Sequence, residues 1–284
     1  MKLSETSQRQ AQHLIVFGDP KTGKSVIVGD LAKYFKLLWI SLDGGHSILY
    51  KLPPEVQNRI DLVILPDTKD YPIGIETCRK LIKGGSHNVC NLHGKVSCFL
   101  CLKNKAEFTT VDFDKLDLSW IVVWDHISQL ADSALNHIMK DMDEEAKPGW
   151  DEWMKQGSLM ARFLTNLQHS PINQICIAHC LEAELEDGKA KVFPQCGTRN
   201  FSRGVGKYFD HVIHCDVRNK KHSFGSSTTY LPLILTGSRS DVSLETMKEG
   251  EVSLLPCFNI QLINPAKDAP FAVLTEVSKG VTKS

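Results

Sequence analysis

The chain has 284 residues, of which 42% are apolar and 23% are charged, a composition typical of a soluble globular protein with one large domain. Its 33 basic and 33 acidic residues balance, so the totals exclude a chain that is basic throughout. No apolar run approaches the ~20 residues that span a bilayer, and the polar start MKLSETSQRQAQ lacks the apolar core of a signal peptide. We therefore expect a cytoplasmic protein with no membrane partner.

Charge is unevenly distributed along the chain. Residues 79–105 contain six basic and no acidic side chains, and residues 199–221 contain six basic and two acidic ones. Residues 141–152 show the opposite bias, with six acidic side chains and one basic. A polyanionic partner is therefore expected to meet the first two segments and to avoid the third.

The strongest motif lies in LIVFGDPKTGKS, residues 14–25, where a short apolar strand leads into a glycine-rich loop and a helix over residues 24–35. The segment matches the phosphate-binding pattern G-x-x-x-x-G-K-[ST], in which loop N–H groups surround phosphate oxygens. Lys24 would reach the β- and γ-phosphates of ATP, and the Ser25 hydroxyl would ligate Mg²⁺. The alternative is a strand–turn–helix with chance glycines. The expected nucleotide-binding residues are Gly18, Asp19, Pro20, Lys21, Thr22, Gly23, Lys24, Ser25 and Val26.

Three further apolar segments end in a polar side chain. Asp125 ends WIVVWD and is expected to hold Mg²⁺ together with Ser25, although it could instead cap the following helix. Asp43 follows LLWISL and could polarise the attacking water, or it could be a turn residue. His179 follows INQICIA and could sense the γ-phosphate, or it could simply form a hydrogen bond.

The alternation of strands with helices predicts an α/β fold with a mostly parallel, doubly wound sheet. Ligands of such sheets bind beyond the carboxyl ends of the strands, where Asp43, Asp125 and His179 are all expected. We expect a single domain over residues 1–284, ending in a tail, residues 265–284, that carries no motif.

The segment CNLHGKVSCFLC, residues 90–101, places three cysteines and a histidine at the spacing C-x2-H-x4-C-x2-C. In a reducing compartment such a cluster favours metal binding over disulfides. Disulfides and free thiols are the alternatives, and His87 is a further candidate ligand. We expect a small basic zinc-knuckle insertion over residues 86–105, and its contact with DNA or with a partner subunit is left open. The ligands of a closed, structural Zn²⁺ site would be Cys90, His93, Cys98 and Cys101.

In their order, these segments resemble the RecA-fold ATPases, and more narrowly the small phage-type RecA-like ATPases of single-strand annealing and recombination. The resemblance covers roughly residues 14–239. It rests on GDPKTGKS, WISLDGG, IVVWDHISQL, WDEWMKQGSLMARFL, ICIAHCLEAELEDGKAKVFPQCG and KYFDHVIHCDVR. It implies a RecA-like P-loop core. One residue departs from the family pattern, because Asp43 stands where a glutamate is usual. Its carboxylate is one methylene shorter, so either hydrolysis is slow or the loop lies closer.

The resemblance also implies DNA-contacting loops at two places. The first, residues 131–157, is acidic and is left unassigned. The second lies between His179 and Phe209, is expected to be mobile without a partner, and offers Phe193 and Phe201 for stacking on bases. An ordinary solvated surface loop is the alternative. The expected contacts to DNA phosphates are Arg199, Arg203 and Lys207.

Finally, the resemblance implies a homo-oligomer, either ring or filament, in which a neighbour's basic residue completes the active site. Arg239 is the expected residue and Lys207 the second choice, while a surface salt bridge is the alternative for Arg239. The expected function is a DNA-stimulated, single-stranded-DNA-binding ATPase of recombination or annealing, in the host cytoplasm if phage-encoded. A single-strand-binding protein is left open as a further partner. The alternatives are a RecA-fold helicase or helicase loader, and a nucleotide-gated DNA-binding protein with negligible hydrolysis.

Overall fold

A mostly parallel sheet forms the centre of the protein. The computed structural model describes residues 11–184, 190–218, 221–225, 236–238 and 254–258, so Arg239 and the tail, residues 265–284, lie outside the described part. The sheet has the order β11-β10-β1-β7-β6-β2-β3, with β12 also paired to β10. Its strands are β1 (His13–Gly18), β2 (Lys36–Ser41), β3 (Ile60–Ile64), β6 (Trp120–Asp125), β7 (Asn173–Ala178), β10 (His211–Arg218), β11 (Lys221–Gly225) and β12 (Gly237–Ser238).

The six strands from β10 to β3 run parallel, whereas β11 and β12 pair antiparallel with β10. The predicted parallel sheet is therefore confirmed. Every residue of β1 and of β7 is buried. Continuous apolar runs of this kind are typical of parallel strands, because helices cover both of their faces.

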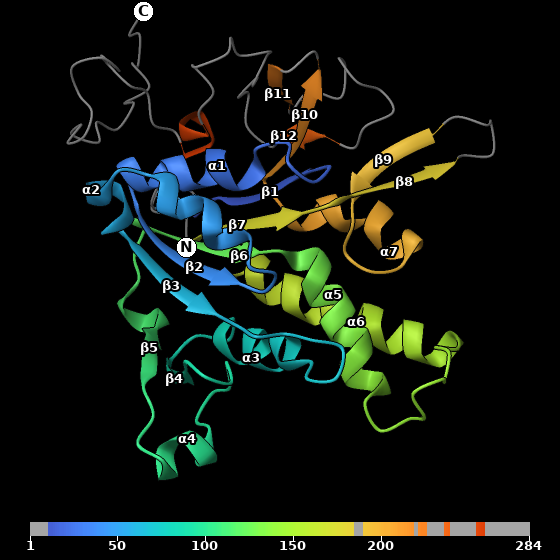
Figure 1. Cartoon of the computed structure of the whole chain (residues 1–284). Helices are drawn as coiled ribbons and strands as arrows, with labels where there is room; N and C mark the ends of the chain where they lie inside the picture. The colour runs from blue at the N-terminus through green and yellow to red at the C-terminus, as the bar shows by residue number, and fades with distance from the viewer. Residues whose placement is uncertain (1–10, 185–189, 219–220, 226–235, 239–253, 259–284) are drawn as a thin grey trace, which may run out of the picture.

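Helices lie on both faces of the sheet, as the doubly wound prediction requires (Figure 1). Ile15 and Phe17 of β1 join the core that faces α3, α5 and α6, whereas Leu14 and Val16 join the core beneath α1. The α-helices are α1 (Lys24–Gly29), α2 (Pro54–Gln57), α3 (Ile73–Leu81), α4 (Phe99–Lys103), α5 (Ile127–Met139), α6 (Trp150–Gln168) and α7 (Arg199–Arg203). The 3-10 turns are η2 (Asp30–Lys33), η3 (Gly45–Lys51), η4 (Phe113–Lys115), η5 (Val205–Tyr208) and η6 (Leu255–Phe258).

The helix after the glycine loop is shorter than predicted. The sequence favours a helix over residues 24–35, but α1 ends at Gly29 and continues as the 3-10 turn η2. Glycine is a poor helix former. It also leaves room for η3, because a Cβ on Gly29 would lie 2.9 Å from Cδ2 of Leu49 and would shift that side chain.

Strand register brings the carboxyl ends of the central strands to one edge of the sheet. Ser41 at the end of β2 pairs with Asp125 at the end of β6, and Asp125 pairs with Ile177 of β7. Phe17 of β1 pairs with Ala178 of β7. The glycine loop after β1 and the residues that follow β2, β6 and β7 therefore meet at this edge.

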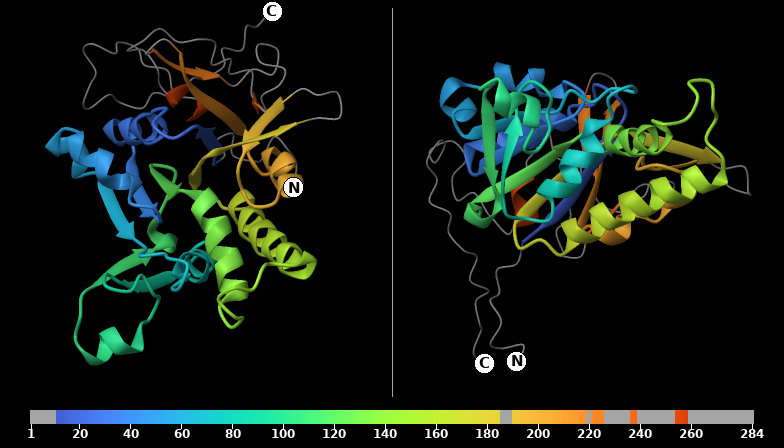
Figure 2. Two further views of the ribbon diagram at one scale, coloured as in Figure 1. Left: turned by 45° about the vertical axis from the view of Figure 1, so that its right-hand side comes forward. Right: turned by 90° about the horizontal axis from the view of Figure 1, so that it is seen from below.

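Two antiparallel hairpins project from the core (Figure 2). The first joins β4 (Ser86–Cys90) to β5 (Phe108–Asp112) and carries α4, and the second joins β8 (Cys180–Glu184) to β9 (Ala190–Pro194) ahead of α7. The expected loop between His179 and Phe209 is thus, in its described part, a hairpin followed by helical turns. Within the described residues, no helix combines the length and the apolarity needed to cross a membrane.

Candidate active site

The glycine-rich loop connects β1 to α1 and holds the side chain of Lys24. Gly23 has a φ of 88° and Lys21 a φ of 68°, and left-handed residues of this kind fold the loop tightly. Lys24 is 4% exposed, and its ammonium donates hydrogen bonds to the carbonyl oxygens of Gly18 (2.9 Å) and Asp19 (2.7 Å). Burial lowers the pKa of Lys24. The glycine loop therefore holds the Lys24 ammonium against its own backbone, where a phosphate-binding loop needs a cation.

Asp125 ends β6 with no exposed surface. Its Oδ2 accepts a hydrogen bond of 3.0 Å from Nε1 of Trp39, which lies on the neighbouring strand β2. Its Oδ1 is buried and has no hydrogen-bond partner, although Nε2 of His126 is 3.3 Å away. Burial, reinforced by the charge of Asp43, raises the pKa of Asp125 to about 7. A buried oxygen without a hydrogen-bond partner, on a carboxylate that feels the charge of Lys24 in the glycine loop, fits a ligand of Mg²⁺.

The capping alternative for Asp125 has no support in this geometry. Residue His126, not Asp125, occupies the cap position of α5, and the helix start has no side-chain hydrogen bond. Among the described residues, the hydrogen-bond partner of the Asp125 carboxylate is Trp39.

His126, Asp43 and His179 form a cluster next to Asp125. Nε2 of His126 lies 3.4 Å from Oδ2 of Asp43, and the other Asp43 oxygen accepts a hydrogen bond of 2.8 Å from the backbone N–H of Gly45. The His126 and His179 rings stack with centroids 4.5 Å apart. Burial lowers the pKa of His126 to about 4 and also lowers the pKa of His179, so both imidazoles are neutral at pH 7. Asp43, His126 and His179 are close enough to share a metal ion.

His126 and Trp39 were not among the predicted site residues. His126 directly follows Asp125 in the segment WDHIS, so its place beside the predicted carboxylate was the available signal. Trp39 is two residues before Ser41, the register partner of Asp125. Its contact with Asp125 depends on the pairing of β2 with β6, which the sequence of a single apolar segment does not indicate.

The β8–β9 hairpin begins directly after β7, at the edge of the sheet where the candidate site lies. β7 ends at Ala178 and β8 begins at Cys180, so His179 is the single residue that connects the two strands. The His179 N–H donates to Oγ of Ser128 (2.9 Å), and the same hydroxyl donates to the carbonyl of Gln195 after β9 (2.8 Å). The Cys180 thiol donates to Oδ1 of Asp19 in the glycine loop (2.7 Å), and burial followed by Asp19 raises its pKa to about 12. These hydrogen bonds tie the hairpin to both the nucleotide loop and α5.

The three predicted DNA contacts lie together on the surface beyond this hairpin. Arg199 and Arg203 belong to α7 and Lys207 to η5, and all three are exposed. The expectation that Phe193 stacks on bases is wrong. Phe193 has no exposed surface, because it pairs with Leu181 across the hairpin and α7 packs against β9. Phe201 is partly buried against the main core, with its ring centroid 6.5 Å from that of Tyr208.

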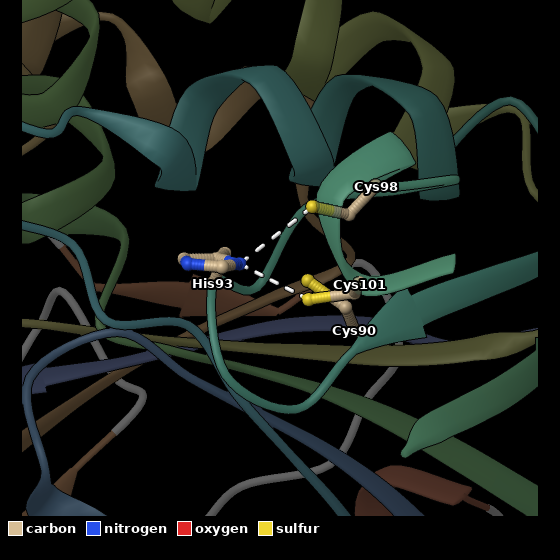
Figure 3. Close-up of side chains that lie close together, drawn as sticks. All are labelled: Cys90, His93, Cys98 and Cys101. Atoms are coloured by element: carbon tan, nitrogen blue, oxygen red, sulfur yellow. Dashed lines mark hydrogen bonds between the residues drawn. The ribbon is translucent and has the colours of Figure 1, made fainter. Parts of the chain in front are cut away.

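The cysteine-rich segment gathers its four predicted ligands in one place (Figure 3). Nδ1 of His93 lies 3.1 Å from Sγ of Cys101 and 3.6 Å from Sγ of Cys98. The fourth side chain is Cys90, and the ligand atoms all lie within 4.8 Å of one another. All nine cysteines of the chain are free, so the disulfide alternative does not describe this structure. Three thiols and an imidazole at this spacing can hold one tetrahedral metal ion.

The turn between the two ligand pairs is fixed by Gly94. Its φ is 62°, and a Cβ there would lie 2.7 Å from Cδ of Pro66. Its carbonyl accepts a hydrogen bond of 2.6 Å from the Thr77 hydroxyl of α3. The spare candidate His87 points elsewhere, with Nε2 2.9 Å from the carbonyl oxygen of Gly84.

The glycine loop, the buried aspartate two strands away and the strand order define a RecA-like P-loop ATPase. The chain belongs to the AAA domain family, which matches residues 10–240. Its structure is similar to the RadB recombinase (14% identity, 76% of this chain and 80% of that one, TM-score 0.38). It is also similar to the flagellar accessory protein FlaH from Methanocaldococcus jannaschii (12% identity, 76% and 77%, TM-score 0.38).

A third similar structure is a prototypical ATPase from the type III secretion system of pathogenic bacteria (14% identity, 81% of this chain and 58% of that one, TM-score 0.43). No curated protein is significantly similar in sequence. At these low identities and TM-scores, the class is carried by the family match and by the strand order.

We expect Asp125→Asn to stabilise the metal-free protein at alkaline pH. The pKa of Asp125 is about 7 in the folded protein against 3.8 ordinarily, so the native state binds its proton more tightly. The stability contributed by this proton is full below pH 4 and is lost as the pH rises to 7. An amide carries no charge to desolvate, so the variant should exceed the wild type by about 4 kcal/mol at pH 8 and match it near pH 4.

Urea unfolding in magnesium-free buffer at the two pH values measures this difference. An equal effect of the substitution at both pH values would contradict the account, because a pH-independent change reports altered packing instead of the cost of burying a charge.

Proposed function

We propose that the protein is a magnesium-dependent ATPase that binds single-stranded DNA and acts as an oligomer in recombination or strand annealing. The observation that carries the proposal is the meeting of Lys24, Asp125 and Asp43 at one edge of the sheet. The charges of Lys24 and Asp43 both act on the Asp125 carboxylate, which has a buried oxygen without a hydrogen bond. This combination of cation, metal ligand and second carboxylate suits phosphoryl transfer to water.

In this proposal, residues 18–26 surround the phosphates and Lys24 contacts the β- and γ-phosphates. Ser25 and Asp125 hold Mg²⁺, which when bound neutralises charge on the phosphate oxygens. Nucleotide binding frees Lys24 from the two loop carbonyls that it now contacts. The site thus exchanges internal hydrogen bonds for phosphate contacts.

The proposed general base is Asp43, and His126 is its positioning residue. Gly45 fixes one oxygen of Asp43, and His126 faces the other at 3.4 Å. A neutral imidazole at that place holds the carboxylate without adding positive charge. His179 stacks on the His126 ring and is proposed to sense the γ-phosphate.

A second function is favoured by the same interactions. Both Asp43 oxygens already face protein groups, and the side chain is short, so water activation is expected to be slow. A nucleotide-gated DNA-binding protein with negligible hydrolysis would use the same loop to change shape on ATP binding. The DNA dependence of turnover separates the two functions.

The proposed DNA surface is formed by α7 and η5, with Arg199, Arg203 and Lys207 as phosphate contacts. Its support is the path from this surface to the nucleotide loop. Ser128 joins the start of α5 to both ends of the hairpin, and Cys180 joins the hairpin to Asp19. A single-strand-binding protein as further partner and Arg239 as a residue acting on a neighbour's ATP belong to this proposal.

We further propose that Cys90, His93, Cys98 and Cys101 bind one structural Zn²⁺. The support is the donor set and its spacing within 4.8 Å. A backbone N–H of Cys101 lowers the pKa of Cys98 to about 7, so thiolate is available there near neutral pH. Four protein ligands leave no open position, so the metal would hold the hairpin together and take no part in ATP chemistry.

We expect Lys24→Ala to abolish ATP binding and turnover, because the variant has no cation to face the β- and γ-phosphates. Wild-type turnover should rise when single-stranded DNA is added. The measurements are nucleotide affinity and phosphate release with and without single-stranded DNA. Lys69→Ala, an exposed lysine away from the loop, is the matched control. Turnover that DNA leaves unchanged, with ATP still promoting DNA binding, would favour the nucleotide-gated function.

The double substitution Arg203→Ala and Lys207→Ala should weaken DNA binding and flatten its dependence on salt. The slope of log affinity against log salt should fall by roughly one unit for each phosphate that no longer pairs with a basic side chain. Fluorescence anisotropy with a labelled single strand at several salt concentrations measures both quantities. Weaker binding with an unchanged slope would place these residues in folding or assembly instead.

The purified protein should contain about one equivalent of Zn²⁺ per chain. Cys98→Ser should lose it, because one of four ligands is removed, while ATP binding survives on the separate glycine loop. Elemental analysis gives the metal content, and Cys180→Ser is the matched control for that content alone, because its thiol lies outside the cluster and contacts Asp19 instead. Zinc-free wild-type protein, purified without chelator, would contradict the site.

A further inference from the structure

Exposed large apolar side chains gather in two short segments. Of thirteen such side chains among the described residues, four lie between residues 92 and 102 and four between residues 142 and 154. Isolated exposed apolar residues are ordinary on protein surfaces, but groups of them mark interaction sites. Neither segment takes part in the proposed ATP chemistry.

The first group lies on the β4–β5 hairpin and is here named the hairpin patch. The ligand cluster occupies the inner side of α4, so only Cys101 of that helix is buried and its other large side chains face outward. Residues 79–105 carry no acidic side chain to offset the basic ones. The patch consists of Leu92, Phe99, Leu100 and Leu102, exposed by 68%, 75%, 61% and 56%, with the exposed Lys95, Lys103 and Lys105.

The second group lies where α5 connects to α6 and is here named the acidic corner. Trp150, Trp153 and Met154 stand in the first turns of α6, at the spacing that places side chains close together on a helix surface. Residues 141–152 contain six acidic side chains and one basic. The corner consists of Met142, Trp150, Trp153 and Met154, exposed by 44%, 76%, 36% and 56%, with the exposed Asp141, Asp143, Glu144, Glu145 and Asp151.

The two surfaces lie at opposite ends of the layer below the sheet (Figures 1 and 2). The hairpin with α4 projects on one side, and the connection from α5 to α6 projects on the other, in each of the three views. The two surfaces therefore do not meet within one chain. They are also complementary, since each has an apolar centre and the surrounding charges are of opposite sign.

We propose that the hairpin patch of one copy binds the acidic corner of the next, so that the chain assembles head to tail. Aromatic side chains such as Phe99 and Trp150 supply much of the binding energy of typical interfaces, and opposite charges around them fix the orientation. An interface between two different surfaces is heterologous, so it repeats from copy to copy and builds a ring or a filament. The inference rests on the proposed oligomeric state, which it deepens by naming both surfaces.

A nucleic acid fits the hairpin patch less well than a second copy does. Phosphates would satisfy the three lysines but would leave four large apolar side chains exposed. They would also leave the acidic corner without a partner, since that corner repels DNA. A second copy covers both surfaces with one interface.

Reversal of charge on each surface tests the pairing. Variant one carries Lys103→Glu and Lys105→Glu in the hairpin patch, and variant two carries Glu144→Lys and Glu145→Lys in the acidic corner. Each variant alone brings like charges together at every interface, so its self-association should weaken at least about tenfold relative to the wild type. Sedimentation velocity over a range of protein and salt concentrations gives the association constants.

An equimolar mixture of the two variants should assemble again. The reversed patch of variant one faces the reversed corner of variant two, and the two unchanged surfaces also match, so the copies alternate. Lys33→Glu with Lys36→Glu, at the end of η2 and the start of β2 and outside both surfaces, is the charge-matched control and should assemble like the wild type. Phe99→Ser should weaken assembly in the same way, and its zinc content verifies that the hairpin remains folded.

Three results would overturn the inference: a wild type that stays monomeric, variants that assemble normally, or a mixture that stays apart. Loss of DNA affinity in variant one, with unchanged sedimentation, would also overturn it and assign the patch to nucleic acid. ATP turnover is measured on the same samples. Restored assembly without any turnover would preserve the interface and remove the ATPase function, so the two failures are distinguishable.

Discussion

The carboxylate of Asp125 is buried at the carboxyl end of the central strand β6. The arrangement of the residues around it depends on how its negative charge is balanced. A buried ionised carboxylate is costly unless it is paired. The Trp39 indole satisfies one oxygen, and the other has no hydrogen bond. The protein therefore keeps a place that a cation stabilises, directly beside the loop whose serine ligates a cation in other P-loop proteins.

The other residues of the site are arranged around the Asp125 carboxylate. In this structure, two carbonyl oxygens at the carboxyl end of β1 hold the Lys24 ammonium within the loop. Gly45 has no side chain, and a Cβ there would lie 2.9 Å from Oδ1 of Asp43 and 3.2 Å from Oδ2 of Asp125. Because residue 45 is a glycine, η3 can begin close to both carboxylates. Asp43, which follows β2, can therefore approach Asp125 despite its short side chain.

Features encoded by short spacings were predictable from the sequence. The glycine loop and the cysteine-rich segment each depend on residues within about a dozen positions, since their chemistry requires fixed offsets. The ends of β2, β6 and β7 were also predictable, because buried parallel strands are continuous apolar runs followed by a polar residue. The convergence of Asp43, Asp125 and His179 follows from those ends.

Features that depend on pairing between distant strands were not predictable in the same way. Trp39 contacts Asp125 across 86 positions of sequence, through a register that no local pattern encodes. The polar segment around Phe193 predicts an accessible aromatic ring, yet the pairing of β8 with β9 and the packing of α7 bury it completely. The stacking of His126 on His179 likewise needs the adjacency of β6 and β7.

The junction between β7 and β8 has a mechanical consequence. His179 directly follows the core strand β7, and the next residue starts the hairpin. A single residue therefore connects the two. A rotation of the His179 backbone must be transmitted to the hairpin as a lever transmits movement at its pivot. Each strand of the hairpin has five residues, so a small rotation at His179 becomes a larger displacement at Glu184 and Ala190, the described ends farthest along the strands from that pivot.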